Sequence, residues 1–392
     1  MKENAIHTSI WAEISFDNLK HNYDILRKKI GDKVMLMGVV KAEAYGHGIT
    51  YMGRELEALG VDYFGVANLQ EAVKLRDGGV TKPILVLGMA WPEDADIVMK
   101  NDINITIDSV EAAERFSKAA VSSGGTIKTH IKIDTGMTRR GIIASGRVDA
   151  AADDVEYITK LKGICVNGMY THFAVADSDD GEEFTEIQFE RFKELCEAVE
   201  KRRIEIPVKH CANSSTVLKY PKMHLDMVRP GIVTYGAAVD KDELCGEDFR
   251  PVMSLKARIA QIKECGEGVT VSYGRTFTAD RDMRIAVVTI GYADGYMRSA
   301  SNRDVMLVHG KRARVLGRVC MDMTMIDVTD IPEAKAGDVV TVFGYDGDVL
   351  LSPISVAENM GTIPNELITV TSRRATRVYI KNGKEIGRIL YV

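Results

Sequence analysis

VMLMGVV (34–40) is the first of eight short apolar runs that alternate with amphipathic stretches as far as residue 236. The intervening stretches place apolar residues at helical spacing, as in FTEIQFERFKELCEAVEKRR (184–203). Eight strands with intervening helices predict a (β/α)8 barrel of the TIM type, because an open doubly wound sheet usually stops at about five or six strands. The other seven runs are YFGVA (63–67), ILVL (84–87), NITI (104–107), IKTHIKI (127–133), ICVNGMY (164–170), PVKH (207–210) and IVTYG (232–236).

The sequence pattern changes after CGEDFRP (245–251). Short alternating runs then follow one another between Gly and Asp turns, as in VMSLKARIAQIKECG (252–266) and RIAVVTIGY (284–292). This pattern predicts a mainly β C-terminal domain. We therefore divide the chain into a barrel of residues 1–244 and a β domain of residues 245–392, and we expect the first dozen residues to pair with the β domain.

The composition is that of an ordinary globular protein, and the α/β class follows from the alternation of predicted strands and helices. The chain has 392 residues, of which 45% are hydrophobic and 27% charged, enough for a large core. Its 51 Lys and Arg against 56 Asp and Glu give a net charge of −5, which argues against a nucleic-acid partner. The start lacks the features of a signal peptide, and no uncharged apolar run reaches the ~18 residues of a membrane span. We expect a cytoplasmic protein with no membrane partner.

Six cysteines are scattered along the chain without a C-x-x-C pair. This spacing argues against both a disulfide framework and a structural zinc site. We therefore expect reduced thiols and no metal. The six are Cys165, Cys196, Cys211, Cys245, Cys265 and Cys320.

Several candidate functional residues stand where predicted strands end, which is the face of a barrel that carries active sites. Lys41 follows the first strand, either as a lysine that extends its amine to solvent or as an amine of lowered pKa suited to Schiff-base chemistry. KIDTGMTRRG (132–141) adds Lys132 and Arg139, and YTHF (170–173) adds His172. Each of these residues is a weak signal alone.

The last two predicted strands lead into a candidate phosphate site, which barrels often form there. In HCANSS (210–215), Asn213 and Ser214 begin a short helix whose free N–H groups would suit a phosphate. MVRPGIVTYG (227–236) follows, with Arg229 over the barrel and Gly231 allowing close approach of the backbone. These residues suggest a phosphate cradle at the same mouth of the predicted barrel as Lys41.

Eight motifs in this order and spacing resemble the alanine racemases, and the resemblance covers nearly the whole chain. It implies pyridoxal 5′-phosphate (PLP) bound in the barrel, and a homodimer whose active sites combine the barrel of one subunit with the β domain of the other. The implied reaction interconverts L- and D-alanine and supplies D-alanine for peptidoglycan. The motifs are VVKAEAYGHG (39–48), KIDTGMTRRG (132–141), MYTHF (169–173), ANSS (212–215), MVRPGIVTYG (227–236), VSYG (271–274), GYADGY (291–296) and VCMDMTMID (319–327).

The same resemblance implies residue roles. Lys41 would bind PLP covalently and act as one base, and Tyr273 of the second subunit would be the base on the opposite face. Arg229 would face the pyridine nitrogen, and His172 would stack on the ring or support the arginine. The remaining cofactor-binding residues, most of them around the phosphate, would be Tyr45, Asn213, Ser214, Gly231, Ile232 and Asn365.

Substrate-binding roles follow from the resemblance as well. Arg139 would bind the ring hydroxyl and the substrate carboxylate region, and Lys132, which is often carbamylated in relatives, would position it. The partner subunit would line the pocket and its entrance with Met321, Asp322, Tyr292 and Arg298.

Three positions depart from the family pattern. Glu43 stands where Asn or Asp is usual and Thr138 where Gly is usual, and we take both as tolerated. In TIPNEL (362–367), Asn365 stands where alanine racemases generally carry a tyrosine. This resembles the serine/alanine racemases, because an amide leaves room and a hydrogen-bonding group for a hydroxymethyl side chain. The alternatives are a neutral substitution or an alignment shifted by one residue.

Three other functions fit parts of this pattern. PLP carrier proteins share the barrel and its lysine but generally lack a β domain. Barrel-type amino-acid decarboxylases use a different C-terminal cysteine motif, for which Cys320 is the candidate, although its neighbours match the racemases better. A broad-specificity racemase for larger or basic amino acids remains a third alternative.

Overall fold

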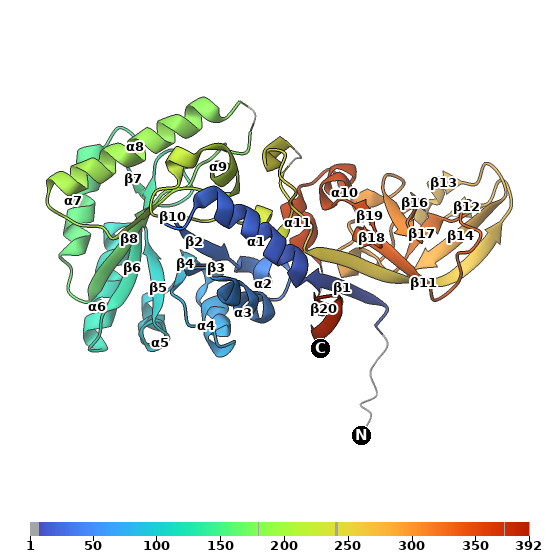
Figure 1. Cartoon of the computed structure of the whole chain (residues 1–392), viewed down its shortest axis with the longest axis horizontal. Helices are drawn as coiled ribbons and strands as arrows, with labels where there is room; N and C mark the ends of the chain where they lie inside the picture. Colours follow the sequence, from blue (N-terminus) through green and yellow to red (C-terminus); the bar gives the residue numbers. More distant parts are fainter. Residues whose placement is uncertain (1–7, 179, 240–241, 372, 392) are drawn as a thin grey trace, which may run out of the picture.

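The computed structural model describes residues 8–178, 180–239, 242–371 and 373–391. It forms two lobes side by side, a barrel and a β lobe, with β1 (Ile10–Ser15) at their junction (Figure 1). Residues 1–7, part of the N-terminal segment expected to pair with the β domain, lie outside the described residues.

The barrel lobe contains eight parallel strands, in the order β10-β2-β3-β4-β5-β6-β8-β9, with the short β7 (Ile142–Ile143) beside β6. Backbone hydrogen bonds from Asp226 N to Lys209 O (3.1 Å) and from Arg229 N to Ala212 O (3.0 Å) join the two ends of this series. The predicted barrel is therefore confirmed. Its strands are β2 (Met35–Val39), β3 (Tyr63–Asn68), β4 (Ile84–Met89), β5 (Ile103–Ile107), β6 (Ile127–Asp134), β8 (Ile164–Tyr170), β9 (Val208–His210) and β10 (Met227–Val228).

The prediction of the eighth strand at 232–236 is wrong. The strand that pairs with β2 is β10, and Ile232–Tyr235 forms a 3-10 helix, η3. Pro230 has no N–H to donate to a sheet, and the chain turns there, so that Thr234 N donates to Gly231 O (3.1 Å). The apolar residues of this segment are buried as a helix, which an apolar run alone does not distinguish from a strand.

Helices cover the outside of the barrel, and polar side chains begin several of them. Ser15, Asn68 and Ser109 each accept a hydrogen bond from a backbone N–H in the first turn of the helix that follows. Among the described residues, no helix is long and apolar enough to cross a membrane. The helices are α1 (Phe16–Ile30), α2 (Lys41–Tyr45), α3 (Ile49–Leu59), α4 (Leu69–Asp77), α5 (Ala95–Lys100), α6 (Val110–Ser122), α7 (Val148–Thr159), α8 (Glu182–Lys201) and α9 (Ser214–Lys219).

The β lobe is built on a ten-stranded sheet in the order β19-β18-β15-β16-β17-β14-β11-β1-β20-β21. β1 pairs antiparallel with β11 and parallel with β20, so strands from both ends of the chain lie in one sheet. The mainly β second lobe is thus confirmed. Its further elements are β11 (Met253–Cys265), β12 (Thr270–Val271), β13 (Phe277–Thr278), β14 (Met283–Val288), β15 (Val305–Val308), β16 (Lys311–Leu316), β17 (Thr324–Asp327), β18 (Val339–Asp346), β19 (Val349–Leu351), α10 (Pro353–Met360), α11 (Pro364–Thr369), β20 (Thr376–Lys381) and β21 (Lys384–Ile389).

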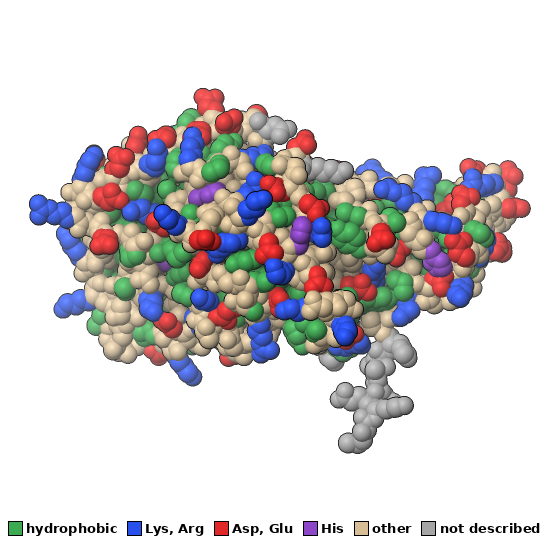
Figure 2. Space-filling view, in the orientation of Figure 1, with side chains coloured by type: hydrophobic (Ala, Val, Ile, Leu, Met, Phe, Trp, Pro, Cys, Tyr) green, Lys and Arg blue, Asp and Glu red, His purple; other side chains and the backbone are tan. Residues whose placement is uncertain are grey.

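The surface carries charges of both signs. Acidic and basic side chains are interspersed over the face of both lobes that Figure 2 shows. This distribution agrees with the nearly balanced charge of the sequence.

Candidate active site

A cavity of about 500 Å³ lies at the mouth of the barrel, where the carboxyl ends of the strands meet. It brings together residues that are up to 326 positions apart in the sequence, from Val39 to Asn365. The predicted site residues that line it are Lys41, Tyr45, Lys132, Arg139, His172, Asn213, Ser214, Arg229, Gly231, Ile232 and Asn365.

Lys41 begins an unusual left-handed turn. The φ angles from Ala42 to Tyr45 lie between 52° and 56°, and Gly46 N closes the turn on Ala42 O (3.0 Å). A left-handed conformation disfavours non-glycine residues by roughly 1–2 kcal/mol each, so the surrounding contacts must hold it. The turn directs Tyr45 into the barrel, where its ring packs on that of Tyr235 with centroids 4.7 Å apart.

Contacts from both lobes hold this turn. The buried His47 places Nδ1 at 3.0 Å from Ala44 O and 2.9 Å from Tyr45 O, so we assign the proton to Nδ1. Burial lowers the pKa of His47 to about 3, so the ring is neutral at pH 7. From β20, Arg377 Nε donates to Gly46 O (2.8 Å) and Tyr379 Oη donates to His47 O (2.9 Å).

The surroundings of Lys41 make its amine lose a proton more easily. Burial in the cavity lowers the pKa of Lys41, the charge of Arg139 lowers it further, and Glu71 opposes both effects. An amine that loses its proton more easily is a better nucleophile toward an aldehyde.

One corner of the cavity has the form of an anion cradle. Ser214 Oγ accepts a hydrogen bond from Gly231 N (2.9 Å). A Cβ atom on Gly231 would lie only 2.5 Å from Tyr45 Oη, so no side chain larger than hydrogen fits there without a shift. Asn213 fixes the adjoining α9, because its side chain accepts from Thr216 N (3.1 Å). Two hydroxyl groups and a closely approaching backbone thus face the same space.

Arg229 also lines the cavity, is almost fully buried and is held by three acceptors. Nη2 donates to Thr171 O (2.9 Å) and Cys211 O (3.1 Å), and Nη1 donates to His210 Nδ1 (2.9 Å). Within the part of the chain that the structure describes, these bonds leave the Nε–H and one Nη1–H available to a ligand in the cavity. His172 Nδ1 is 3.4 Å from Nη2, and burial together with the charge of Arg229 lowers the pKa of His172 well below its usual value.

A chain of neutral rings continues from Arg229 into the barrel. Because a guanidinium can only donate, His210 Nδ1 must accept, and its Nε2–H then donates to His130 Nδ1 (2.9 Å). The remaining His130 Nε2–H donates to Tyr63 Oη (3.2 Å). Burial lowers the pKa of His130 to about 3, and the charge of Arg229 acts in the same direction. The direction of every hydrogen bond in this chain is therefore set by Arg229.

Lys132 and Arg139 lie beside this chain. Lys132 is 6% exposed and places Nζ 4.8 Å from the centroid of the Tyr170 ring. Burial, followed by the charges of Arg229 and Arg139, lowers the pKa of Lys132 well below its usual value. Asp134 accepts hydrogen bonds from Gly136 N (2.8 Å) and Thr138 N (3.1 Å), and so shapes the loop that carries Arg139.

Thr138, one of the three departures, has a φ of 55°. A glycine adopts this angle without strain, so the glycine that the resemblance leads us to expect here would suit this loop.

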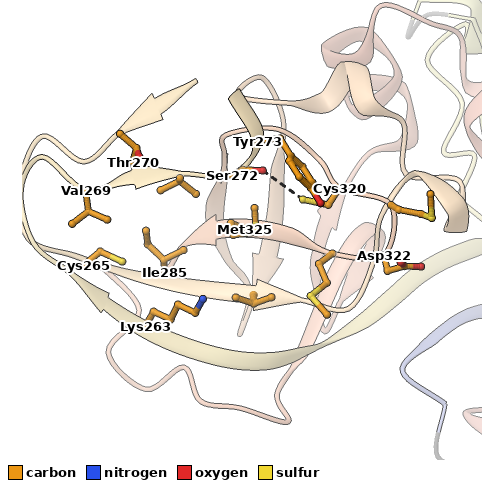
Figure 3. Close-up of a pocket in the computed structure, with 14 residues that line it drawn as sticks. Lys263, Cys265, Val269, Thr270, Ser272, Tyr273, Ile285, Cys320, Asp322 and Met325 are labelled. Atoms are coloured by element: carbon orange, nitrogen blue, oxygen red, sulfur yellow. Dashed lines mark hydrogen bonds between the residues drawn. The ribbon is translucent and has the colours of Figure 1, made fainter. Parts of the chain in front are cut away.

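Tyr273 lies in a different cavity of about 540 Å³, on the β lobe (Figure 3). Its side chain is 70% exposed, next to Ser272, whose Oγ donates to Arg318 O (2.6 Å). Met321 and Asp322 line the same cavity, and none of its lining residues is shared with the barrel cavity. Within one chain, Lys41 and Tyr273 are therefore not brought together.

Tyr292 and Arg298 line neither cavity. Tyr292 begins the 3-10 helix η6 (Tyr292–Asp294) and donates its backbone N–H to Cys320 O (3.0 Å), which places it beside the β-lobe cavity. Arg298 begins η7 (Arg298–Ala300).

Comparison with known proteins decides the family. Residues 14–239 match the alanine racemase N-terminal domain, and residues 252–379 match the alanine racemase C-terminal domain. The chain belongs to the alanine racemase family. The expected family is thus confirmed, and so is its enzyme class, the amino-acid racemases.

Individual alanine racemases resemble the chain over nearly its full length. Alanine racemase 2 of Caldanaerobacter subterraneus is 40% identical over 95% of both chains, and alanine racemase of Desulfovibrio desulfuricans is 41% identical over 95% of this chain and 98% of its own. The structure of alanine racemase from Clostridium difficile 630 superposes with a TM-score of 0.91 at 36% identity, covering 98% of this chain and 99% of that one.

Asn365 is expected from the sequence to stand where alanine racemases generally carry a tyrosine. It lies in α11 and lines the barrel cavity. Its Oδ1 is buried and has no hydrogen-bond partner within the described residues. A buried acceptor without a donor is unfavourable, so a ligand with a hydroxyl or N–H group would satisfy it.

Several polar residues that support the barrel site are not among those predicted from the sequence. His130 and His210 support Arg229, and His47 supports the turn after Lys41. One signal was present: His130 and Lys132 are two positions apart in the apolar run 127–133, and such residues face the same side of a strand.

Proposed function

We propose that the chain interconverts L- and D-alanine with PLP bound in the barrel cavity. One observation carries this proposal: a lysine amine of lowered pKa, a two-hydroxyl cradle and a buried arginine face a single cavity. PLP, when bound, would supply an electron sink that stabilises negative charge at the substrate α-carbon.

The residues of the cavity suit the parts of that cofactor. The Lys41 amine would attach to the aldehyde, and Tyr45, Ser214, Gly231 and Ile232 would surround the phosphate beside Asn213. The free N–H groups of Arg229 would donate to the pyridine nitrogen without giving up a proton, because a guanidinium stays charged. His172 would lie along the ring.

Racemisation needs a base on each face of the α-carbon. We assign Lys41 Nζ to one face and Tyr273 Oη, supplied by a second subunit, to the other. Tyr273, Met321 and Met323 are 70%, 53% and 47% exposed, an apolar surface that a second subunit would cover. The proposed enzyme is therefore a homodimer, with Asp322, Tyr292 and Arg298 at the shared entrance.

Lys132 is suited to carbamylation. A neutral amine adds CO2 and releases one proton, which leaves an anionic carbamate. Burial and the nearby arginines lower the pKa of Lys132, which makes the neutral amine easier to form, and the charges of Arg139 and Arg229 would stabilise the anion. The carbamate would orient Arg139 toward the ring hydroxyl and the substrate carboxylate.

Serine is a second candidate substrate, favoured by the unpartnered Oδ1 of Asn365, which could accept a hydrogen bond from a hydroxymethyl group. The product would be D-serine for modified cell-wall precursors, in place of D-alanine for peptidoglycan. We place either reaction in the cytoplasm, and the free state of all six cysteines agrees with a reducing compartment.

The experiment that tests this function is direct. Purified, PLP-loaded protein is incubated with L-alanine and L-serine separately, and products are separated by chiral chromatography. Turnover of alanine alone supports a racemase that supplies D-alanine for peptidoglycan. Comparable turnover of serine supports the second candidate. If neither amino acid is racemised, the proposal fails and a PLP carrier or another substrate becomes the better explanation.

A further inference from the structure

Glu71 makes a contact that its position in the sequence does not lead one to expect. It is the third residue of α4, which begins after Asn68, and its N–H donates to Asn68 Oδ1 (2.9 Å). A glutamate at this position commonly bonds back to the N–H of the capping residue. Here the carboxylate reaches further, so that Oε2 accepts from Ala67 N (2.8 Å) and Oε1 accepts from Ala42 N (2.6 Å).

The second of these bonds reaches the lysine turn. Ala42 follows Lys41 directly and is the first left-handed residue, with a φ of 53°. On the other side of Lys41, Val40 N donates to Gly65 O of β3 (2.9 Å). The lysine is thus tied to β3 twice, once by the backbone and once through Glu71 and Ala67.

We propose that Glu71 is a positioning residue, whose carboxylate holds the left-handed turn so that Lys41 stays directed into the barrel cavity. His47 and Arg377 hold carbonyl groups at the end of the turn, whereas Glu71 holds the N–H at its start. Hydrogen bonds to an ionised carboxylate are roughly twice as strong as neutral ones, which suits a segment whose backbone conformation is otherwise disfavoured.

The glutamate also acts on Lys41 through its charge, since it raises the pKa of the lysine and so opposes the cavity and Arg139. The positional role does not depend on this effect. The expected effect of Glu71 on PLP binding, in contrast, rests on the proposed function of Lys41.

Glu71→Gln is the test variant, because an amide offers one acceptor where two N–H groups need one each. Glu57→Gln is the matched control. Glu57 lies on α3, where its Oε1 accepts from Thr81 N (2.9 Å) and Lys82 N (2.9 Å) and its Oε2 accepts from Thr81 N (3.3 Å). Both oxygens of this carboxylate thus also hold backbone N–H groups, but none of these belongs to the lysine turn.

The first readout is amide hydrogen exchange of the peptide covering residues 41–48 in protein freed of PLP, followed by mass spectrometry. We expect exchange at least about tenfold faster in Glu71→Gln, and unchanged in Glu57→Gln. The second readout is PLP release from the loaded protein, followed by absorbance, which we expect to accelerate by a similar factor in Glu71→Gln alone.

Unchanged exchange of 41–48 in Glu71→Gln would overturn the proposal, and so would equal acceleration in both variants, which indicates general loosening. If Glu71→Gln does not fold, the shorter Glu71→Asp is measured in the same way, with the same two outcomes. Amide exchange is measured without cofactor or substrate. The exchange result can therefore refute the role of Glu71 even if the wild type racemises alanine. Conversely, a wild type without racemase activity would refute the proposed function and leave this result standing.

Discussion

Gly231→Ala tests the packing of the phosphate corner, the part of the barrel cavity formed by Tyr45, Ser214 and Gly231. The added Cβ would lie 2.5 Å from Tyr45 Oη and 3.9 Å from Ser214 Oγ, whereas ordinary contacts begin at 3.4 Å. The Tyr45 hydroxyl must therefore move by roughly 0.9 Å. It has little freedom to do so, because its ring packs on Tyr235 and its backbone belongs to the left-handed turn.

The expected magnitude follows from this geometry. Overpacking by one methyl group in a tight site costs about 1–3 kcal/mol. If Tyr45 stays in place, the cost lowers the free energy of unfolding of the PLP-free protein. If Tyr45 moves, the phosphate site is deformed, and the same energy weakens PLP binding by about 5- to 150-fold. The sum of the two effects should reach at least about 1 kcal/mol.

A double-mutant cycle with Tyr45→Phe isolates the clash. Phenylalanine removes Oη, so Gly231→Ala should cost at least about 1 kcal/mol less in the Tyr45→Phe background. Any backbone penalty at the φ of −102° and ψ of −94° of Gly231 is common to both backgrounds and cancels. The assays are urea unfolding of PLP-free protein and titration with PLP.

The control is Gly266→Ala, where the nearest atom to the added Cβ is Asp282 Oδ1 at 3.6 Å. This variant should change neither the free energy of unfolding nor the free energy of PLP binding by more than about 0.5 kcal/mol. A Gly231→Ala variant that matches this control in both assays would refute the packing argument.

Three further predictions follow from the site. Tyr273→Phe should retain PLP but lower alanine turnover by at least about 10²-fold, measured by chiral chromatography; unchanged turnover would remove Tyr273 from the mechanism. His130 has its pKa lowered from 6.5 to about 3, so its contribution to stability is present above pH 6.5 and is lost as pH falls toward 3. Between pH 7 and pH 5, this group should lower the free energy of unfolding by about 2 kcal/mol. Urea unfolding at the two pH values should therefore show a smaller decrease for His130→Gln than for the wild type, and an equal decrease would contradict the assignment. Asn365→Tyr should lower kcat/KM for L-serine more than for L-alanine, and a wild-type ratio of serine to alanine below about 1 in 1,000 (roughly 4 kcal/mol) would rule out the serine hypothesis.

Much of the barrel site could be predicted because parallel strands end at one edge. Lys41, Lys132 and His172 each follow or end an apolar run, so the fold alone places them at the same mouth. The supporting histidines could not be predicted in the same way. His130 and His210 lie on strands separated by α7 and α8, and their contact depends on the side-chain packing inside the barrel.

Proline and glycine explain the error at the last strand. IVTYG (232–236) is as apolar and β-branched as a buried strand, and local preference alone does not decide between strand and helix. The preceding Pro230-Gly231 pair ends β10 and turns the chain across the mouth, which places Gly231 against Ser214. The turn at Pro230-Gly231 prevents the predicted strand, and the same turn forms the phosphate corner.

The sequence by itself determined the two-part architecture and the residue types at the barrel mouth, because hydrophobic periodicity and the convergence of parallel strands are local or topological properties. Only the tertiary structure decided three features. These are the left-handed turn after Lys41, the hydrogen-bond direction from Arg229 to Tyr63, and the separation of Tyr273 from Lys41 within one chain. Each depends on contacts between residues far apart in sequence, which outweigh the local preferences of the chain.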